Sequence, residues 1–157
     1  MDKTKSPGIS IKSVHLLECS VGDVKQGADL NFSLGITNFS KAIVSDGKVL
    51  VVTVSFDLMQ GIENPPCKFQ CTFVATYTRP ADTENQNMNW DEFKDHVAVA
   101  HLVPYVREFV SNMTTRLPLS VLMIPPVNTH KLMLEYNQLT LPKSPIATPV
   151  APVTPTA

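Results

Sequence analysis

The chain has 157 residues, which is enough for one domain with a sizeable hydrophobic core. Its 13 lysine and arginine residues nearly balance 14 aspartate and glutamate residues, and a formal net charge of −1 argues against nucleic acid as a partner. Residues 1–8 are polar and no hydrophobic signal region follows them, and no apolar run reaches the length of a membrane span. We therefore expect a cytoplasmic chain without membrane insertion, whose residues 1–8 are flexible.

Four segments in the first half have the periodicity and composition of β-strands: 9–20, 29–38, 48–59 and 68–78. The first alternates imperfectly, as in a strand with one solvated face. The third is rich in β-branched residues, and the turn at 45–47 favours a hairpin between the second and third segments. The side chains expected on the buried faces of the second and fourth segments are Leu30, Phe32, Leu34, Ile36, Phe69, Cys71, Phe73, Ala75 and Tyr77.

The three cysteines, Cys19, Cys67 and Cys71, fit neither a disulfide framework nor a zinc site, because their number is odd and their spacing is wrong. We expect reduced thiols, at least two of them partly buried in the sheet.

Residues 90–117 predict one long helix with Asn89 as a plausible N-cap and with apolar residues on more than one face. Such a helix should be covered on two sides, by its own sheet and by another copy of the chain. Pro104 predicts a kink or a break near residues 102–104. The residues expected between subunits are Leu102, Val106, Phe109 and Met113.

Residues 118–127 should form an extended loop, since Pro125 and Pro126 forbid a helix there. Asn128 can then cap a second helix at residues 129–139. Four strands followed by helices predict an α+β domain: a four-stranded antiparallel sheet, as a meander or Greek key, with the long helix and the short C-terminal helix packed on one face. We expect this domain to span residues 9–139, followed by a disordered tail rich in proline, threonine and alanine at residues 140–157.

Catalytic chemistry is not indicated by any motif. His96 and His101 are five positions apart, so they do not share a helix face as a metal pair would. His101, Tyr105 and Glu108 do share a face, which would suit a proton relay, although a solvated polar stripe is the simpler interpretation. We expect neither an enzyme nor a cofactor or metal site.

Short motifs in the second half resemble the SecB family of cytoplasmic chaperones. They are Pro104-Tyr105-Val106-Arg107-Glu108, Ser111-Asn112-Met113-Thr114 and Pro125-Pro126-Val127-Asn128. The resemblance implies an ATP-independent holdase that binds unfolded polypeptides in hydrophobic grooves, assembled as a homotetramer from dimers. It also implies two alternatives for the biological role: protein export with a SecA-like motor, or protection of an antitoxin or another single partner in a toxin–antitoxin system. The near-zero net charge, and a tail whose one charged side chain is Lys143, differ from the acidic and basic surfaces through which export members contact the motor.

Under this resemblance, lifting of the loop at residues 118–127 would open a groove for the client. The expected lining residues are Phe69, Phe73, Tyr77, Val121, Leu122, Ile124, Leu132 and Tyr136. The simpler interpretation of the same residues is hydrophobic core, and both hold if the groove lies beneath a movable loop.

Overall fold

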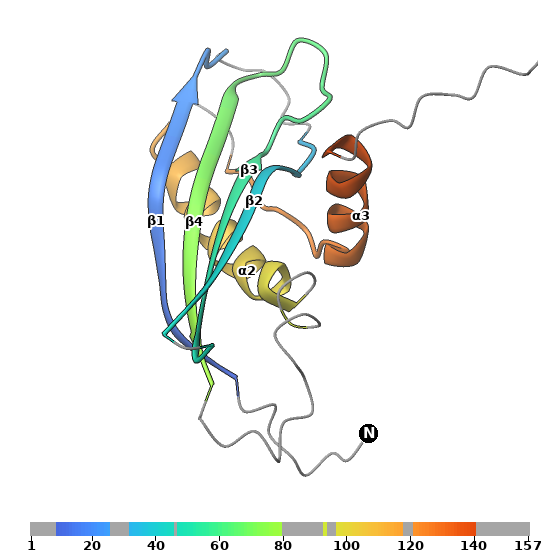
Figure 1. The fold of residues 1–157 in the computed structure, drawn as a ribbon. Helices are drawn as coiled ribbons and strands as arrows, with labels where there is room; N and C mark the ends of the chain where they lie inside the picture. Colours follow the sequence, from blue (N-terminus) through green and yellow to red (C-terminus); the bar gives the residue numbers. More distant parts are fainter. Residues whose placement is uncertain are drawn as a thin grey trace, which may run out of the picture.

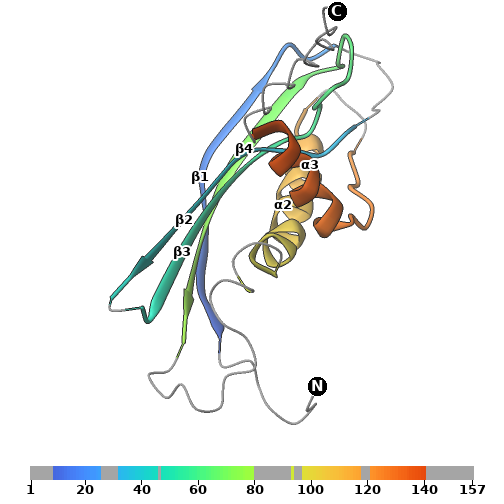
Figure 2. The ribbon, with the colours of Figure 1, turned by 45° about the vertical axis from the view of Figure 1, so that its right-hand side comes forward.

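Four strands and two helices make up the part of the chain that the computed structural model describes, namely residues 9–25, 32–45, 47–79, 93, 97–117 and 121–140. The elements are β1 (Ser10–Gly22), β2 (Gly35–Val44), β3 (Val49–Asp57), β4 (Lys68–Thr78), α2 (Ala98–Thr114) and α3 (Thr129–Thr140). All strand pairs are antiparallel, in the order β1-β4-β3-β2. Both helices lie on one face of the sheet (Figures 1 and 2). The expected α+β architecture is confirmed, and the strand order is that of a Greek key.

Several expectations fall outside the described residues. These are the flexible segment 1–8, Leu30, the cap at Asn89 with most of residues 90–96 (His96 included), residues 118–120 of the predicted loop, and the tail apart from Thr140, which ends α3.

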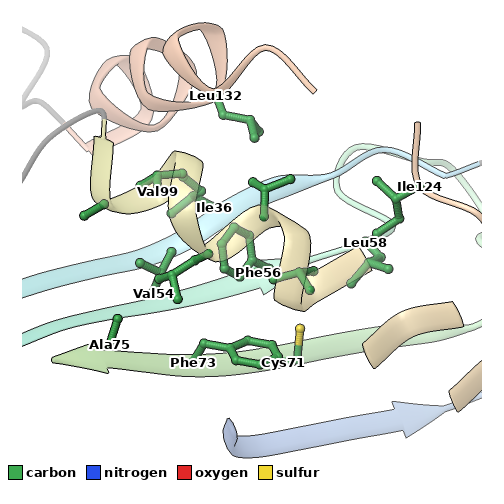
Figure 3. Close-up of a cluster of buried hydrophobic side chains, with 14 of the residues drawn as sticks. Ile36, Val54, Phe56, Leu58, Cys71, Phe73, Ala75, Val99, Ile124 and Leu132 are labelled. Carbon is green, nitrogen blue, oxygen red and sulfur yellow. The ribbon is translucent and has the colours of Figure 1, made fainter. Parts of the chain in front are cut away.

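The core lies on β3 and β4, the two central strands. Every second residue of each strand is buried, so one full face of the pleat packs beneath the helices. Directly opposed pairs such as Val54 with Phe73 and Phe56 with Cys71 place large side chains beside one another (Figure 3). The remaining opposed pairs on this face are Leu50 with Tyr77 and Val52 with Ala75.

The imperfect alternation of β1 has a structural cause. Its pairing with β4 shifts register at residues 11–13 and again at residues 16–18. Each irregularity adds an unpaired residue, so the alternation between faces restarts on the other set of positions. Ile11, Leu16 and Cys19 therefore all lie opposite buried residues of β4. In a regular strand, Leu16 would point to the other face from Ile11 and Cys19, because it is an odd number of positions from both.

The prediction for β2 is wrong in its bounds. The expected strand at residues 29–38 overlaps the observed one only at residues 35–38, and residues 39–44, expected to be loop, pair with β3. Phe32 and Leu34 precede the strand and are half-buried. Residues 40–44 are exposed on an edge strand, so no buried face marked them in the sequence. The hairpin they belong to extends past both helices (Figure 2).

The turn of this hairpin lies at residues 45–47, as predicted. Ser45 and Gly47 both have positive φ angles, of 54° and 80°, and the Lys48 N–H donates to the Ser45 carbonyl at 3.1 Å. Glycine tolerates this left-handed backbone without steric cost.

α2 runs without interruption through Pro104, so the expected break at residues 102–104 does not occur. Pro104 lies on the exposed side of the helix. The buried side is wide, as the sequence indicated, and consists of Ala98, Val99, Leu102, Val103, Val106, Val110 and Thr114.

α3 begins as predicted, with Asn128 as its cap. The Asn128 side-chain oxygen accepts the Lys131 N–H at 3.0 Å, and the Asn128 carbonyl accepts the Leu132 N–H at 3.1 Å. We expect Asn128→Ala to lower the free energy of unfolding by about 1 kcal/mol, because a backbone donor of the first turn loses its partner. Urea denaturation of this variant should be compared with Asn128→Asp, which keeps the acceptor. Equal losses in the two variants would contradict a capping role.

Candidate functional site

Residues 121–128 connect α2 to α3 as an extended segment, which we call the crossover loop. Its first residues alternate: Leu122 and Ile124 are buried, whereas Val121 and Met123 are 50% and 69% exposed. Figure 3 shows Ile124 beside Leu58, in the cluster of buried apolar side chains. The loop is therefore anchored to the core by two side chains, while its outward face offers apolar surface.

The start of the loop is tied to the last residue of α2. Thr114 is the one buried polar side chain among the described residues, and its hydroxyl accepts the Leu122 N–H at 3.0 Å. The same hydroxyl donates to the Val110 carbonyl at 2.9 Å.

The end of the loop borders a depression of about 400 Å³, which adjoins a second one of about 310 Å³. The two share Ser33 and Glu135, and we call them together the α3 groove. Its apolar lining consists of Phe32, Leu34, Pro125, Pro126, Val127 and Leu132. Leu139 lies at its far end and is 71% exposed.

The rim of the α3 groove is polar but nearly neutral. Lys131 and Glu135 form an exposed i,i+4 ion pair at 3.7 Å, and uncharged side chains such as Gln60 and Gln138 complete the rim. An exposed pair of this kind contributes little free energy. The groove thus offers apolar contact with peripheral hydrogen-bonding groups, the combination that suits a peptide or small apolar ligand.

The residues predicted to line one client groove lie in different parts of the structure. Phe69 and Phe73 pack edge-to-face against Phe109 of α2, with ring centroids 6.2 and 5.9 Å apart. The Tyr77 hydroxyl donates to the Ala98 carbonyl at 3.3 Å. These three aromatic residues of β4 are covered by α2, so lifting the crossover loop alone would leave them buried.

Two further predicted residues, Leu132 and Tyr136, belong to α3. Leu132 lines the α3 groove, and Tyr136 contacts the edge strand β2. The Tyr136 hydroxyl accepts the Phe39 N–H at 3.2 Å, and the two rings meet edge-to-face at 6.4 Å. Of the predicted groove residues, Leu132 borders the α3 groove together with the end of the loop, and Ile124 borders a separate depression of about 280 Å³ beside α2.

Sequence reasoning missed Phe32 and Leu34 because it placed them inside a strand. One signal was present at Gly35, in the middle of that predicted strand. A Cβ atom at Gly35 would lie 1.2 Å from the Gln60 Oε1 atom and 2.9 Å from the Gln60 Cβ atom, so a larger residue here would require the Gln60 side chain to move. Gly35 marks the true start of β2, and the residues before it turn toward α3 and line the groove instead.

The residues predicted at the subunit interface differ in how much surface they offer. Leu102 and Val106 are 0% exposed in the single chain, so they have no side-chain surface left for a partner in this structure. Phe109 and Met113 are half-buried. Exposed apolar residues near this part of the fold are Ile11 and Leu16 of β1 and Tyr105 of α2.

The histidine of α2 is packed among aromatic rings. His101 lies 6.0 Å from the Tyr77 ring and 5.7 Å from the Phe93 ring, and burial lowers its pKa. Its buried Nδ1 atom has no hydrogen-bond partner among the described residues. Burial raises the pKa of Tyr77, with Tyr105 adding to the shift. A neutral histidine without a hydrogen-bonded partner gives no support to a proton relay with Tyr105 and Glu108.

The three cysteines are free thiols, as predicted. Cys67 and Cys71 are buried and Cys19 is half-buried opposite Cys71. Burial raises the pKa of Cys71 to about 12, with Cys19 adding to the shift. A thiol with so high a pKa is a poor nucleophile near neutrality. Within the described ranges, no group of three histidine, cysteine or acidic side chains is arranged to hold a metal ion.

No family model and no curated protein matches the sequence. Among solved structures, the fold is similar to a SecB-like chaperone from Mycobacterium tuberculosis in complex with a ChAD peptide from the HigA1 antitoxin. The identity is 19%, the match covers 76% of this chain and 90% of that chain, and the TM-score is 0.56. A protein of unknown function from Streptococcus agalactiae matches at 12% identity over 74% of this chain and 97% of that chain, with a TM-score of 0.42. The chain therefore has a SecB-like fold. None of the helices in its described ranges has the length and apolar composition to span a membrane.

Proposed function

We propose that this protein is a chaperone that holds unfolded polypeptide segments in the α3 groove without nucleotide or any other cofactor. The observation that carries the proposal is an open apolar groove beside an extended loop, in a chain with a SecB-like fold. The proposed site differs from the one expected from the sequence, because the aromatic residues of β4 lie beneath α2.

The groove has the physical properties that a holdase needs. Burial of apolar surface contributes about 25 cal/mol per Å² and does not depend on direction, so many different side chains can bind. A nearly neutral rim imposes no charge requirement on the client. Leu139, at the far end of the groove, adds exposed apolar surface to it.

A dedicated antitoxin chaperone is the second candidate. It is favoured by the similar solved structure, which holds an antitoxin peptide. Purification of the protein with its bound material, followed by mass spectrometry, separates the two: many unrelated clients support a general holdase, and one recurrent partner supports a dedicated chaperone.

A role in export through a SecA-like motor has weaker support. The sheet face opposite the helices carries mainly hydroxyl and amide groups, as in the cross-strand row of Glu18, Thr72, Ser55 and Asn38. Ser55 and Thr72 hydrogen-bond to each other at 2.9 Å in this row. Two carboxylates on this face, Glu18 and Asp57, among mainly neutral groups do not make the acidic surface that the resemblance associates with motor binding.

We also propose that the chain assembles into homo-oligomers, with a dimer of dimers as the expected form. The surface proposed for this contact comprises Tyr105, Phe109 and Met113 of α2, together with the exposed Ile11 and Leu16 of β1, which lie opposite Tyr77 and Phe73 of β4. Exposed apolar surface of this kind is typical of a protein–protein contact.

We expect the protein to suppress aggregation of an unrelated denatured protein at stoichiometric amounts, and Leu139→Glu to weaken that activity. Burial of one leucine side chain contributes about 1.5–3 kcal/mol, so the affinity for a permanently unfolded probe, reduced and carboxymethylated lactalbumin, should fall by roughly 10- to 100-fold. Fluorescence anisotropy with the labelled probe measures this change.

Leu134→Glu is the matched control, because Leu134 is an exposed leucine of the same helix that does not line the groove. This variant should bind as the wild type does. Equal weakening in both variants would place the binding surface elsewhere, and no binding by the wild type would overturn the proposed function.

A further inference from the structure

We propose that Thr114 is the positioning residue of the α3 groove, because its hydroxyl fixes the backbone of the loop that forms one wall of that groove. This inference rests on the proposed function. Thr114 does not line the groove and would not contact the client; it would act through Leu122 and the residues that follow.

The local geometry suits this role. Thr114 is the last residue of α2 and is 1% exposed. A hydroxyl has one proton and two lone pairs, so it can donate to the Val110 carbonyl at 2.9 Å and still accept the Leu122 N–H at 3.0 Å. Both bonds are buried, which leaves water no access to replace either partner.

The loop has few other means to hold its backbone in place. Among the described residues, the bond from Leu122 to Thr114 is the one hydrogen bond that reaches the backbone of residues 121–127. Pro125 and Pro126 have no N–H group and cannot add one. The remaining anchors are side chains: Leu122 and Ile124 are buried, and the exposed Met123 sulfur accepts the Ser111 hydroxyl at 3.5 Å.

A short segment of chain joins Leu122 to the wall of the groove. Pro125 begins the groove wall three residues after Leu122, about 10 Å along an extended chain. The two prolines restrict the backbone at residues 124–126, which leaves Met123 as the one unrestricted residue between Leu122 and this stiff segment, so we expect a displacement at Leu122 to displace the wall as well. A wall held in place before binding avoids the entropy cost of ordering it when the client arrives.

The test compares Thr114→Val, which keeps the shape and removes the hydroxyl, with Thr114→Ser, which keeps the hydroxyl. In Thr114→Val, the Leu122 amide should exchange its hydrogen about tenfold faster, and the affinity for carboxymethylated lactalbumin should fall about tenfold. Thr114→Ser should restore both values. Circular dichroism verifies folding, and Thr114→Cys, a similarly small side chain with a weaker acceptor, replaces Thr114→Val if the valine variant does not fold.

The outcomes separate this inference from the proposed function. Unchanged exchange at Leu122 in a folded Thr114→Val protein overturns the role of Thr114 alone. Faster exchange with unchanged affinity shows that Thr114 holds the loop without positioning the groove, and also overturns the inference. Absence of binding by the wild type overturns the proposed function, and with it any role of Thr114 in binding.

Discussion

Replacement of Val106 by aspartate is expected to unfold the chain rather than only separate its subunits. Val106 lies on α2, is 0% exposed in the single chain and belongs to the core cluster beneath the helix. The new carboxylate would be buried without a partner, or α2 would have to leave the sheet. We expect a loss of more than about 4 kcal/mol, a large part of the 5–15 kcal/mol by which native domains are stable. Far-UV circular dichroism during urea denaturation measures this loss.

Tyr105→Asp is the control for the contribution of assembly. Tyr105 precedes Val106 in the helix but is 41% exposed, so its replacement should leave the chain folded. If the exposed side of α2 takes part in an oligomer, sedimentation of Tyr105→Asp should show smaller particles than the wild type. A Val106→Asp protein that unfolds at the wild-type urea concentration would contradict the burial of this residue.

The two positions also show what the sequence could and could not predict about α2. The spacing of apolar residues predicted a helix with a broad buried surface, because a period of 3.6 residues is visible in any sequence. It did not reveal which part of that surface the sheet would cover. Leu102 and Val106 were expected between subunits, but the sheet of the same chain already covers them.

The sheet was predictable to the extent that burial alternates along a strand. β3 and β4 alternate strictly and were located within two residues. β2 was displaced because its second half is exposed on an edge, where backbone pairing rather than side-chain burial defines the strand. The pattern of apolar residues in a single sequence indicates which side chains are buried. It therefore misses strand segments whose backbone pairs with a neighbour while their side chains stay exposed.

The candidate site was the least predictable part for the same reason. The sequence identified the crossover loop and Asn128 as the start of α3, since prolines and caps are local signals. It could not show that Phe32 and Leu34 would meet that loop, a contact between residues about ninety positions apart.

Phe56→Ala should therefore mainly lower stability, whereas Phe32→Ala should mainly weaken client binding. Phe56 is fully buried in β3, opposite Cys71, and its truncation leaves a cavity in the centre of the core. We expect a loss of about 3–5 kcal/mol in the free energy of unfolding. Affinity for the unfolded probe, measured on the fraction that remains folded, should be unchanged because Phe56 does not line the groove.

Phe32 is half-buried and lines the α3 groove, so its truncation should cost less stability, about 1 kcal/mol, since part of its surface is already in water. The same change removes apolar contact with the client and should weaken binding by about tenfold. From its sequence pattern, Phe32 was expected in the strand core, where the larger cost would apply. Urea denaturation and probe titration of both variants distinguish the two placements. A loss of about 3–5 kcal/mol in the free energy of unfolding of Phe32→Ala, with unchanged affinity for the probe, would show that Phe32 is a core residue. It would also contradict client binding at this wall of the groove.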